Sequence, residues 1–151
     1  MKALKFIFVS VMLAFAITAT AQNEKTVKKI DVPEHIANKF SNDHPQSPNA
    51  KWSMDGENYV VEFATADGVN KKLWYNKAGE IHSEELTLKS ENDLPSRLRD
   101  IMSGKYAGYK VNRIVEVKNV GITSYRLRIE KDGEFKDILL DANGKEIDGF
   151  N

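Results

Sequence analysis

The chain has 151 residues, of which 22 are basic and 22 acidic, so its formal net charge is zero. Such a balance gives no reason to expect nucleic acid as a partner. The absence of cysteine excludes disulfides, thiolate metal sites and cysteine nucleophiles, so the apolar core alone must hold the folded chain together.

The N-terminal residues have the pattern of a secretory signal peptide. A short basic start is followed by an almost entirely apolar run over residues 6–17 and by small side chains at positions 19–21. The apolar run is shorter than the roughly 20 residues that span a bilayer, and no second run follows it. We therefore expect a signal peptide over residues 1–21, cleaved near Ala21 and Gln22, and a periplasmic or secreted mature chain without a membrane span.

Beyond the signal peptide, the sequence contains an internal repeat. Three segments recur in the same order: VPEHI at 32–36 as LPSRL at 94–98, NYVVEF at 58–63 as SYRLRI at 124–129, and NKAG at 76–79 as DANG at 141–144. The offsets of 62, 66 and 65 residues indicate a duplicated unit with small loop insertions. We expect a flexible N-terminal tail over residues 22–30 and one domain over residues 31–151, made of repeats 31–90 and 91–151.

A helix is predicted from about Pro33 to Asn42. Apolar residues recur there at every fourth position, which gives one narrow apolar face: Val32, Ile36 and Phe40. Proline suits the first turn because no amide donor is needed there, and Asp31 is available as a cap. A helix this short needs a surface on which to pack.

After this helix the pattern changes to the alternation of half-buried strands. Tyr59, Val61 and Phe63 point one way, and the residues between them point the other. Asp-Gly pairs at 55–56 and 67–68 tolerate positive φ and predict tight hairpin turns. The predicted strands of this half are Ala50 to Met54, Tyr59 to Ala64, Val69 to Tyr75 and Glu80 to Leu88.

The second half repeats this order. A second helix is predicted from the apolar face formed by Leu94, Leu98, Ile101 and Met102. Gly104 is suited to the left-handed residue that ends this helix. Asp-Gly at 132–133 and Asn-Gly at 143–144 predict two more hairpin turns. The strands predicted here are Tyr109 to Lys118, Ile122 to Glu130, Glu134 to Asp141 and Lys145 to Ile147.

Each repeat is therefore predicted to be one helix followed by four antiparallel strands, which is an α+β arrangement. A helix and a meander that each have one apolar face satisfy each other by packing in two layers. Duplication then gives an antiparallel sheet with both helices packed on one face and the opposite face open to water. Two arrangements fit the sequence: the two four-stranded units join edge to edge, or they stay two lobes.

Several of these segments also carry a resemblance to a known family. They are spread over nearly all of the mature chain: Val32-Pro33, Leu94-Pro95, Trp52, Tyr59 to Phe63, Trp74 to Ile81 and Leu139 to Ile147. In these segments the chain resembles the PepSY-like and beta-lactamase-inhibitor-like (BLIP-like) domains of exported bacterial proteins, most of which have no assigned function. The resemblance implies a two-layer domain with a helix-backed, concave antiparallel sheet. It also implies binding through the open sheet face or restraint of a peptidase, and it transfers no catalytic residue.

The open face of the predicted sheet supplies the candidate partner-binding residues. If Tyr59, Val61 and Phe63 face the helix, strand alternation leaves five side chains on the open face: Lys72, Trp74, Arg126, Arg128 and Leu139. An aromatic side chain beside basic groups is typical of interface hot spots. The alternative is that Trp74 and Leu139 cover a shallow second core, while the arginines are ordinary solvated strand residues.

Metal and enzyme chemistry have weaker support in the sequence. His35, His44 and His82 fall on a helix, a loop and a strand and match no ligand spacing. Residues 141–144 resemble a calcium loop, but Leu139 stands where the first acidic ligand should be. The chain has no Gly-x-Ser-x-Gly, His-Glu-x-x-His, phosphate-binding glycine loop or Ser-x-x-Lys. We therefore expect no metal site, no cofactor and no catalytic residues.

The leading hypothesis is an exported, non-catalytic binding module that engages a protein or peptide through the open face or an edge of its sheet, in an inhibitor-like or regulator-like role. The alternative is a periplasmic sensor of a small ligand or metal, with histidine and acidic side chains as ligands. An enzyme comes third, since it requires a deep pocket with convergent polar groups.

Overall fold

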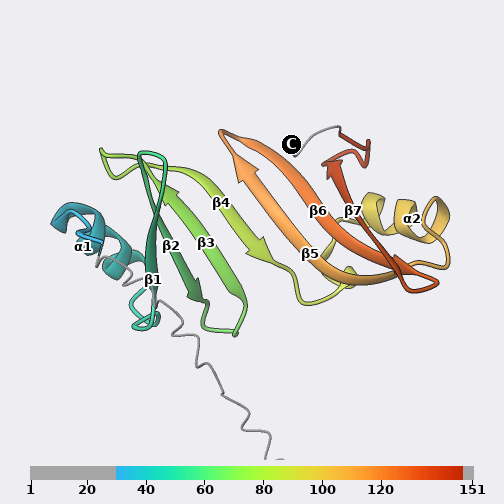
Figure 1. The fold of residues 1–151 in the computed structure, drawn as a ribbon, viewed down its shortest axis with the longest axis horizontal. Coiled ribbons are helices and arrows are strands. Elements are labelled where there is room, and N and C mark those ends of the chain that lie inside the picture. The colour runs from blue at the N-terminus through green and yellow to red at the C-terminus, as the bar shows by residue number, and fades with distance from the viewer. Residues whose placement is uncertain (1–29, 148–151) are drawn as a thin grey trace, which may run out of the picture.

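The computed structural model describes residues 30–147, which form one antiparallel sheet of seven strands and two α-helices (Figure 1). The strand order is β1-β2-β3-β4-β5-β6-β7, so each strand pairs with its neighbours in sequence. The two halves of the chain therefore join edge to edge, through the pairing of β4 with β5. The predicted signal peptide, residues 1–21, and all but the last residue of the predicted tail, residues 22–30, lie outside the described residues.

The strands up to Asp141 lie within one residue of their predicted ends. In chain order the elements are α1 (Glu34–Asp43), β1 (Lys51–Asp55), β2 (Asn58–Ala64), β3 (Asn70–Tyr75), β4 (Ile81–Thr87), the 3₁₀ helix η1 (Glu91–Asp93), α2 (Ser96–Gly104), β5 (Lys110–Asn119), β6 (Ile122–Lys131) and β7 (Glu134–Asp141). Strong alternation and glycine turns defined these strands well, whereas η1 was not predicted.

The eighth predicted strand, Lys145 to Ile147, is not formed. This segment makes one isolated bridge, between Leu140 and Glu146, and the Ile147 amide donates to the Leu139 carbonyl at 2.9 Å. The turn after β7 does bring the segment back beside that strand, but a single bridge is too short to make a ladder. The described second half thus has three strands, and the prediction of four was wrong.

Both helices begin directly after a proline. Pro33 and Pro95 are the N-cap residues of α1 and α2, where a missing amide hydrogen costs nothing. Two predictions about the helix ends were wrong. Asp31 is not the cap, because no side chain of the described residues caps α1. Gly104 ends α2 without turning left-handed, because the chain continues through Lys105 with φ of −61°.

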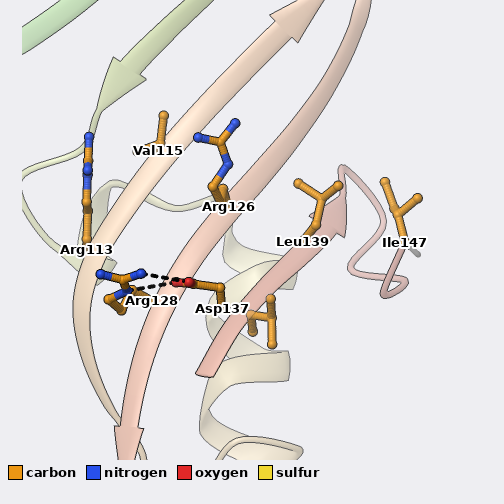
Figure 2. A pocket seen from close by; sticks show the side chains of 8 residues that line it. Arg113, Val115, Arg126, Arg128, Asp137, Leu139 and Ile147 are labelled. Carbon is orange, nitrogen blue, oxygen red and sulfur yellow. Dashed lines mark hydrogen bonds and ion pairs between the residues drawn. The ribbon is translucent and has the colours of Figure 1, made fainter. Parts of the chain in front are cut away.

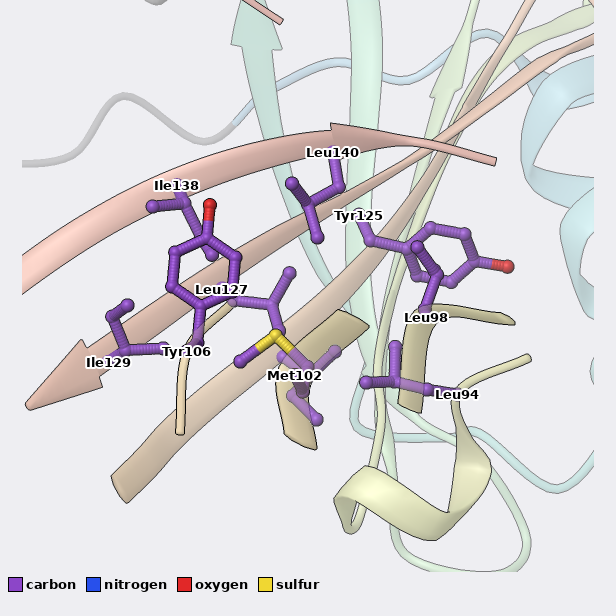
Figure 3. Close-up of a cluster of buried hydrophobic side chains, with 10 residues drawn as sticks. Leu94, Leu98, Met102, Tyr106, Tyr125, Leu127, Ile129, Ile138 and Leu140 are labelled. Carbon is purple, nitrogen blue, oxygen red and sulfur yellow. The ribbon is translucent and has the colours of Figure 1, made fainter. Parts of the chain in front are cut away.

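Each helix packs on a separate hydrophobic core. The core under α1 consists of Ile36, Phe40, Val61, Phe63, Leu73 and Tyr75. The core under α2 consists of Leu94, Leu98, Met102, Tyr106, Ile114, Tyr125, Leu127, Ile129, Ile138 and Leu140 (Figure 3). The apolar residues that were predicted to face the helices are therefore the residues that pack against them.

The strand register places both cores on one face of the sheet. Leu73 pairs with Glu84, and Glu84 pairs with Lys118. Side chains alternate along a strand, so Ile114, four residues before Lys118, points to the same side as Leu73. Both helices therefore cover this face, as predicted. We call the opposite side of the sheet the open face, because neither α1 nor α2 packs on it.

Between the two cores, the helix-covered face is charged. Lys71 pairs with Glu84 at 2.9 Å, and Lys118 pairs with Glu116 at 2.8 Å. Tyr125 donates its hydroxyl to Glu116 at 3.1 Å. Burial is the main cause that raises the pKa of Tyr125 to about 12. The sheet is continuous, but its apolar layer is divided by this charged seam of Lys71, Glu84, Glu116 and Lys118.

The turns that follow β3 and β7 have the same hydrogen bonds. The side-chain oxygen of Asn76 accepts from the amides two and four residues later, at 2.9 and 3.0 Å. The carboxylate of Asp141 accepts from the equivalent two amides at 2.8 and 2.9 Å. Gly79 and Gly144, at the fourth position of each turn, have φ of 81° and 82°, a conformation that glycine adopts without strain.

Candidate binding groove on the open sheet face

The five predicted partner-binding residues all lie on the open face: Lys72, Trp74, Arg126, Arg128 and Leu139. Each of them is next to a core residue of its own strand, so alternation turns it away from the helices. Arg126 pairs with Leu139, and Arg128 pairs with Asp137. Lys72 and Trp74 lie on β3, which β4 and β5 separate from β6.

A groove of about 580 Å³ lies on the open face over β5, β6 and β7 (Figure 2). Its lining residues are Arg113, Val115, Arg126, Arg128, Asp137, Ile138, Leu139 and Ile147. Val115 is buried and Leu139 half-buried, while Ile147 is 38% exposed. The structure thus brings three of the predicted residues into one site, and it leaves Lys72 and Trp74 outside that site.

Two of the three arginines at the groove are held by acidic neighbours. Arg128 donates from Nε and Nη2 to the two carboxylate oxygens of Asp137, at 2.9 and 2.8 Å. These hydrogen bonds raise the pKa of Arg128 and lower the pKa of Asp137. Arg126 donates from Nη2 to Glu85 of β4 at 3.0 Å, across β5. The pairing fixes the orientation of both guanidinium groups.

The third arginine, Arg113, reaches the open face because β5 contains a bulge. Val111 pairs with Ile129 and Arg113 pairs with Arg128, the preceding residue of β6, so Asn112 is an extra residue. The side-chain amide of Asn112 donates from Nδ2 to Glu130 of β6 at 2.9 Å. The exposed guanidinium of Arg113 makes no hydrogen bond or ion pair with the side chains of residues 30–147.

Five groove residues were missed by the sequence analysis: Arg113, Val115, Asp137, Ile138 and Ile147. Plain alternation from Val111 puts Arg113 on the helix-covered face, and the bulge reverses this order. Asp137 could have been found, since it shares the parity of Leu139 along β7. Ile147 had no comparable signal, because the bridging segment after β7 places it.

Trp74 lies on the half of the open face outside the groove, where it contacts its neighbouring strands. Its Nε1 donates to Asp55 at 2.9 Å, and it pairs across the strands with Val60, which is 5% exposed. Lys72 pairs with Glu62 at 3.2 Å. These contacts fit the alternative interpretation, in which Trp74 covers a shallow second apolar layer.

The three histidines lie in separate settings. His35 contacts a carbonyl of the β3–β4 turn at 3.2 Å, and His82 lies on β4. His44 packs on the rings of Phe40 and Phe63, and burial is the main cause that lowers its pKa below 6.5. Within residues 30–147, no group of three or more histidine or acidic side chains is placed to hold a metal ion.

Across the same residues, no helix combines the length and apolar character needed to cross a membrane.

Comparison with solved structures identifies proteins of the same fold. A DUF2874 family protein from Bacteroides uniformis is 16% identical, with a TM-score of 0.68 over 78% of this chain and 88% of its own. A BLIP-like protein from Bacteroides fragilis is 22% identical, with a TM-score of 0.64 over 80% and 86% of the two chains. A Bacteroides eggerthii protein, provisionally described as periplasmic, is 15% identical, with a TM-score of 0.68 over 79% and 88%.

No family model and no curated protein matches the chain. At these identities, the likeness to solved structures establishes the fold alone. It supports the BLIP-like part of the resemblance, whereas none of the three structures is described as PepSY-like. The chain therefore has an α+β, BLIP-like fold: one antiparallel sheet with two helices on one face and a groove on the other.

Proposed function

We propose that the mature chain is an exported, non-catalytic module that binds a protein or peptide in the groove of its open face. The observation that carries this proposal is the groove itself, which places three arginines beside the apolar side chains of Val115, Leu139 and Ile147. Arginine beside apolar side chains is typical of the central part of protein interfaces. Binding of this kind suits an inhibitor or a regulator.

Two of the structural neighbours support parts of this proposal. One is described as BLIP-like, which favours a protein partner over a small molecule. Another is provisionally described as periplasmic, which agrees with the signal peptide expected at residues 1–21. We propose cleavage near Ala21 and Gln22, so that residues 22–151 form the mature chain in the periplasm or outside the cell.

We also propose that repeats 31–90 and 91–151 descend from one duplicated unit. The two equivalent turns described above support this, as does the contact that each makes with its helix. His35 contacts the carbonyl of Lys77 through Nε2 at 3.2 Å. Arg97, the equivalent residue of α2, donates from Nε to the carbonyl of Asn143 at 2.9 Å. In both halves, the side chain at the same helix position thus contacts a carbonyl of the equivalent turn.

Equivalent positions on the open face form an ion pair in each half, with the charges exchanged. In the first half Lys72 of β3 pairs with Glu62 of β2 at 3.2 Å. In the second half the equivalent residues are Asp137 and Arg128, which pair at 2.8 Å. A conserved arrangement with exchanged charges is the expected outcome when two copies of one unit diverge in what they bind.

The proposed duplication also gives a reason for the groove to lie in the second half. Val60 and Trp74, which pack together in the first half, correspond to Arg126 and Leu139 in the second. The leucine is shorter than the indole and leaves space above β7, and the arginine on β6 places a charged side chain beside this space instead of a buried valine. We propose that the first half keeps a closed apolar layer while the second half binds.

Affinity capture from envelope extract of the host, with residues 22–151 as bait, tests the proposed function. Leu139→Gln removes apolar surface from the groove, and Ile122→Gln is the matched control, since Ile122 lies on the same face outside the groove and is 69% exposed. We expect the wild type and Ile122→Gln to retain a partner that folded Leu139→Gln loses. Equal capture by both variants, or no partner for the folded wild type, would contradict the proposal.

A further inference from the structure

The groove carries one more positive charge than its acidic neighbours balance. Arg126 is paired with Glu85, and Arg128 is paired with Asp137. Among residues 30–147, Arg113 has no such acidic partner. A charged partner that reaches the groove therefore meets one guanidinium whose hydrogen-bond donors are still available.

The position of Arg113 in the sheet is unfavourable in the isolated chain. It lies directly opposite Arg128 in the register of β5 and β6, and like charges at directly opposed positions destabilise a sheet. The bulge at Asn112 puts it there, and bulges next to functional sites commonly redirect a side chain. A carboxylate bound to Arg113 would relieve this repulsion.

Two apolar residues of the groove, Leu139 and Ile147, lie across β6 from Arg113. Leu139 is on β7, and the hydrogen bond from the Ile147 amide to the Leu139 carbonyl keeps Ile147 beside it. Two strand spacings, about 10 Å, separate β5 from β7. Leu139 also lies two residues, about 7 Å, further along the strands than Arg113, because it pairs with Arg126 and Arg113 pairs with Arg128. The resulting separation of about 12 Å is covered by three to four residues of an extended peptide.

We propose that the groove binds an extended segment of a partner protein that carries a carboxylate side chain and, about three to four residues away, a large apolar side chain. The carboxylate pairs with Arg113, and the apolar side chain packs on Leu139 and Ile147. This inference rests on the proposed function and states the chemistry of its partner.

Selection of displayed random peptides on residues 22–151 tests the inference. We expect the selected peptides to share an Asp or Glu and an apolar residue at this spacing. One selected peptide is then synthesised twice, with the acid and with the corresponding amide, and its Kd is measured for Arg113→Gln and for Lys51→Gln, an exposed control on the same face. Arg113→Gln should weaken the acidic peptide about tenfold, leave the amide peptide unchanged and abolish the salt dependence.

The outcomes separate this inference from the proposed function. Peptides that lose binding with Leu139→Gln, but show no acidic preference or no response to Arg113→Gln, would overturn the carboxylate site and leave the groove as the binding site. Peptides that bind Leu139→Gln as tightly as the wild type, or no selected peptide at all, would overturn both. Arg113 has no partner to lose within the described residues and lies opposite Arg128, so the Tm of its variant should equal or slightly exceed that of the wild type.

Discussion

Val120 holds a backbone conformation that costs stability. It has φ of 45° in the two-residue turn between β5 and β6, and Gly121 follows with φ of 78°. Positive φ at both central positions is the geometry of a type I′ hairpin turn, in which Asn-Gly is favoured. A β-branched residue is strained there, and the side chain of Val120 is 81% exposed, so packing does not offset the strain.

Val120→Asn should therefore stabilise the protein by about 1 kcal/mol, because asparagine tolerates left-handed backbone better than valine. Urea denaturation measures the difference in the free energy of unfolding. Asp132 has φ of 53° at the same position of the next hairpin, and Asp132→Asn is a matched control that should change little. A Val120→Asn variant no more stable than the wild type would show that valine is not strained in this turn.

His44 should make the stability depend on pH in the weakly acidic range. Burial, followed by the charge of Lys71, lowers the pKa of His44 below its ordinary value of 6.5. The unfolded chain then binds the proton more tightly than the folded chain. This contribution is fully present above pH 6.5 and is lost as the pH falls through the folded-state pKa.

His44→Gln should remove that loss, because glutamine does not titrate. Thermal unfolding at about pH 7.5 and about pH 5 measures the loss of stability between the two conditions. Carboxylates with ordinary pKa values change their protonation little in this window. The wild type should lose more stability than His44→Gln between the two conditions. Equal losses would mean that another group controls the response.

At the scale of single elements, the turns after β3 and β7 determine how closely the helices approach the sheet. A side chain at Gly144 would overlap the Cδ1 atom of Ile101 and lie 3.2 Å from Cδ2 of the buried Leu98. At Gly68, with φ of 78°, a Cβ would meet nothing within 4 Å. The two positions share the left-handed backbone and differ in their neighbours.

Gly144→Ala should destabilise the protein by about 2–4 kcal/mol, as the sum of backbone strain and overpacking against α2. Gly68→Ala should cost about 1 kcal/mol, because only the strain applies. Chemical denaturation of both variants gives the comparison. Equal costs would mean that α2 shifts to accept the new methyl group without loss.

Regular alternation made most strands and their faces predictable, and its interruptions caused the errors. Along β2 the apolar residues that were predicted to face the helix do so, and the five residues of β3, β6 and β7 that were predicted on the open face lie there. The bulge in β5 breaks this rule between Val111 and Arg113, and nothing in the sequence marks it. Arg113, the groove arginine without an acidic partner among the described residues, is therefore the residue that plain alternation puts on the wrong face. The last predicted strand, Lys145 to Ile147, does not form, because its three residues make only one bridge to β7 and no ladder of hydrogen bonds.

For the whole molecule, the continuous sheet carries two cores that share no residue. The sequence predicted two apolar units but did not decide whether they join in one sheet. The reason is that β4 and β5 pair through backbone hydrogen bonds, which leave no mark in the sequence. In addition, every residue of β4 is half-buried, so its side chains do not alternate between buried and exposed. The charged seam covers this junction on the helix side.

Core substitutions should therefore act mainly on their own half. Leu73→Ala and Leu127→Ala should each cost about 2–5 kcal/mol. Under native conditions, hydrogen exchange should show the larger loss of protection in β1–β3 for Leu73→Ala and in β6–β7 for Leu127→Ala. A uniform loss across the sheet in both variants would show that the two halves unfold as one cooperative unit.

Photo-crosslinking in the native host tests most directly whether the open face binds the partner. A benzoylphenylalanine is placed at Leu139 in the groove or, as a control, at Lys39 on the exposed side of α1. We predict a specific crosslinked adduct from position 139 and none from position 39. An adduct from position 39 alone, or from neither position in the folded protein, would contradict the assignment of the binding site to the open face.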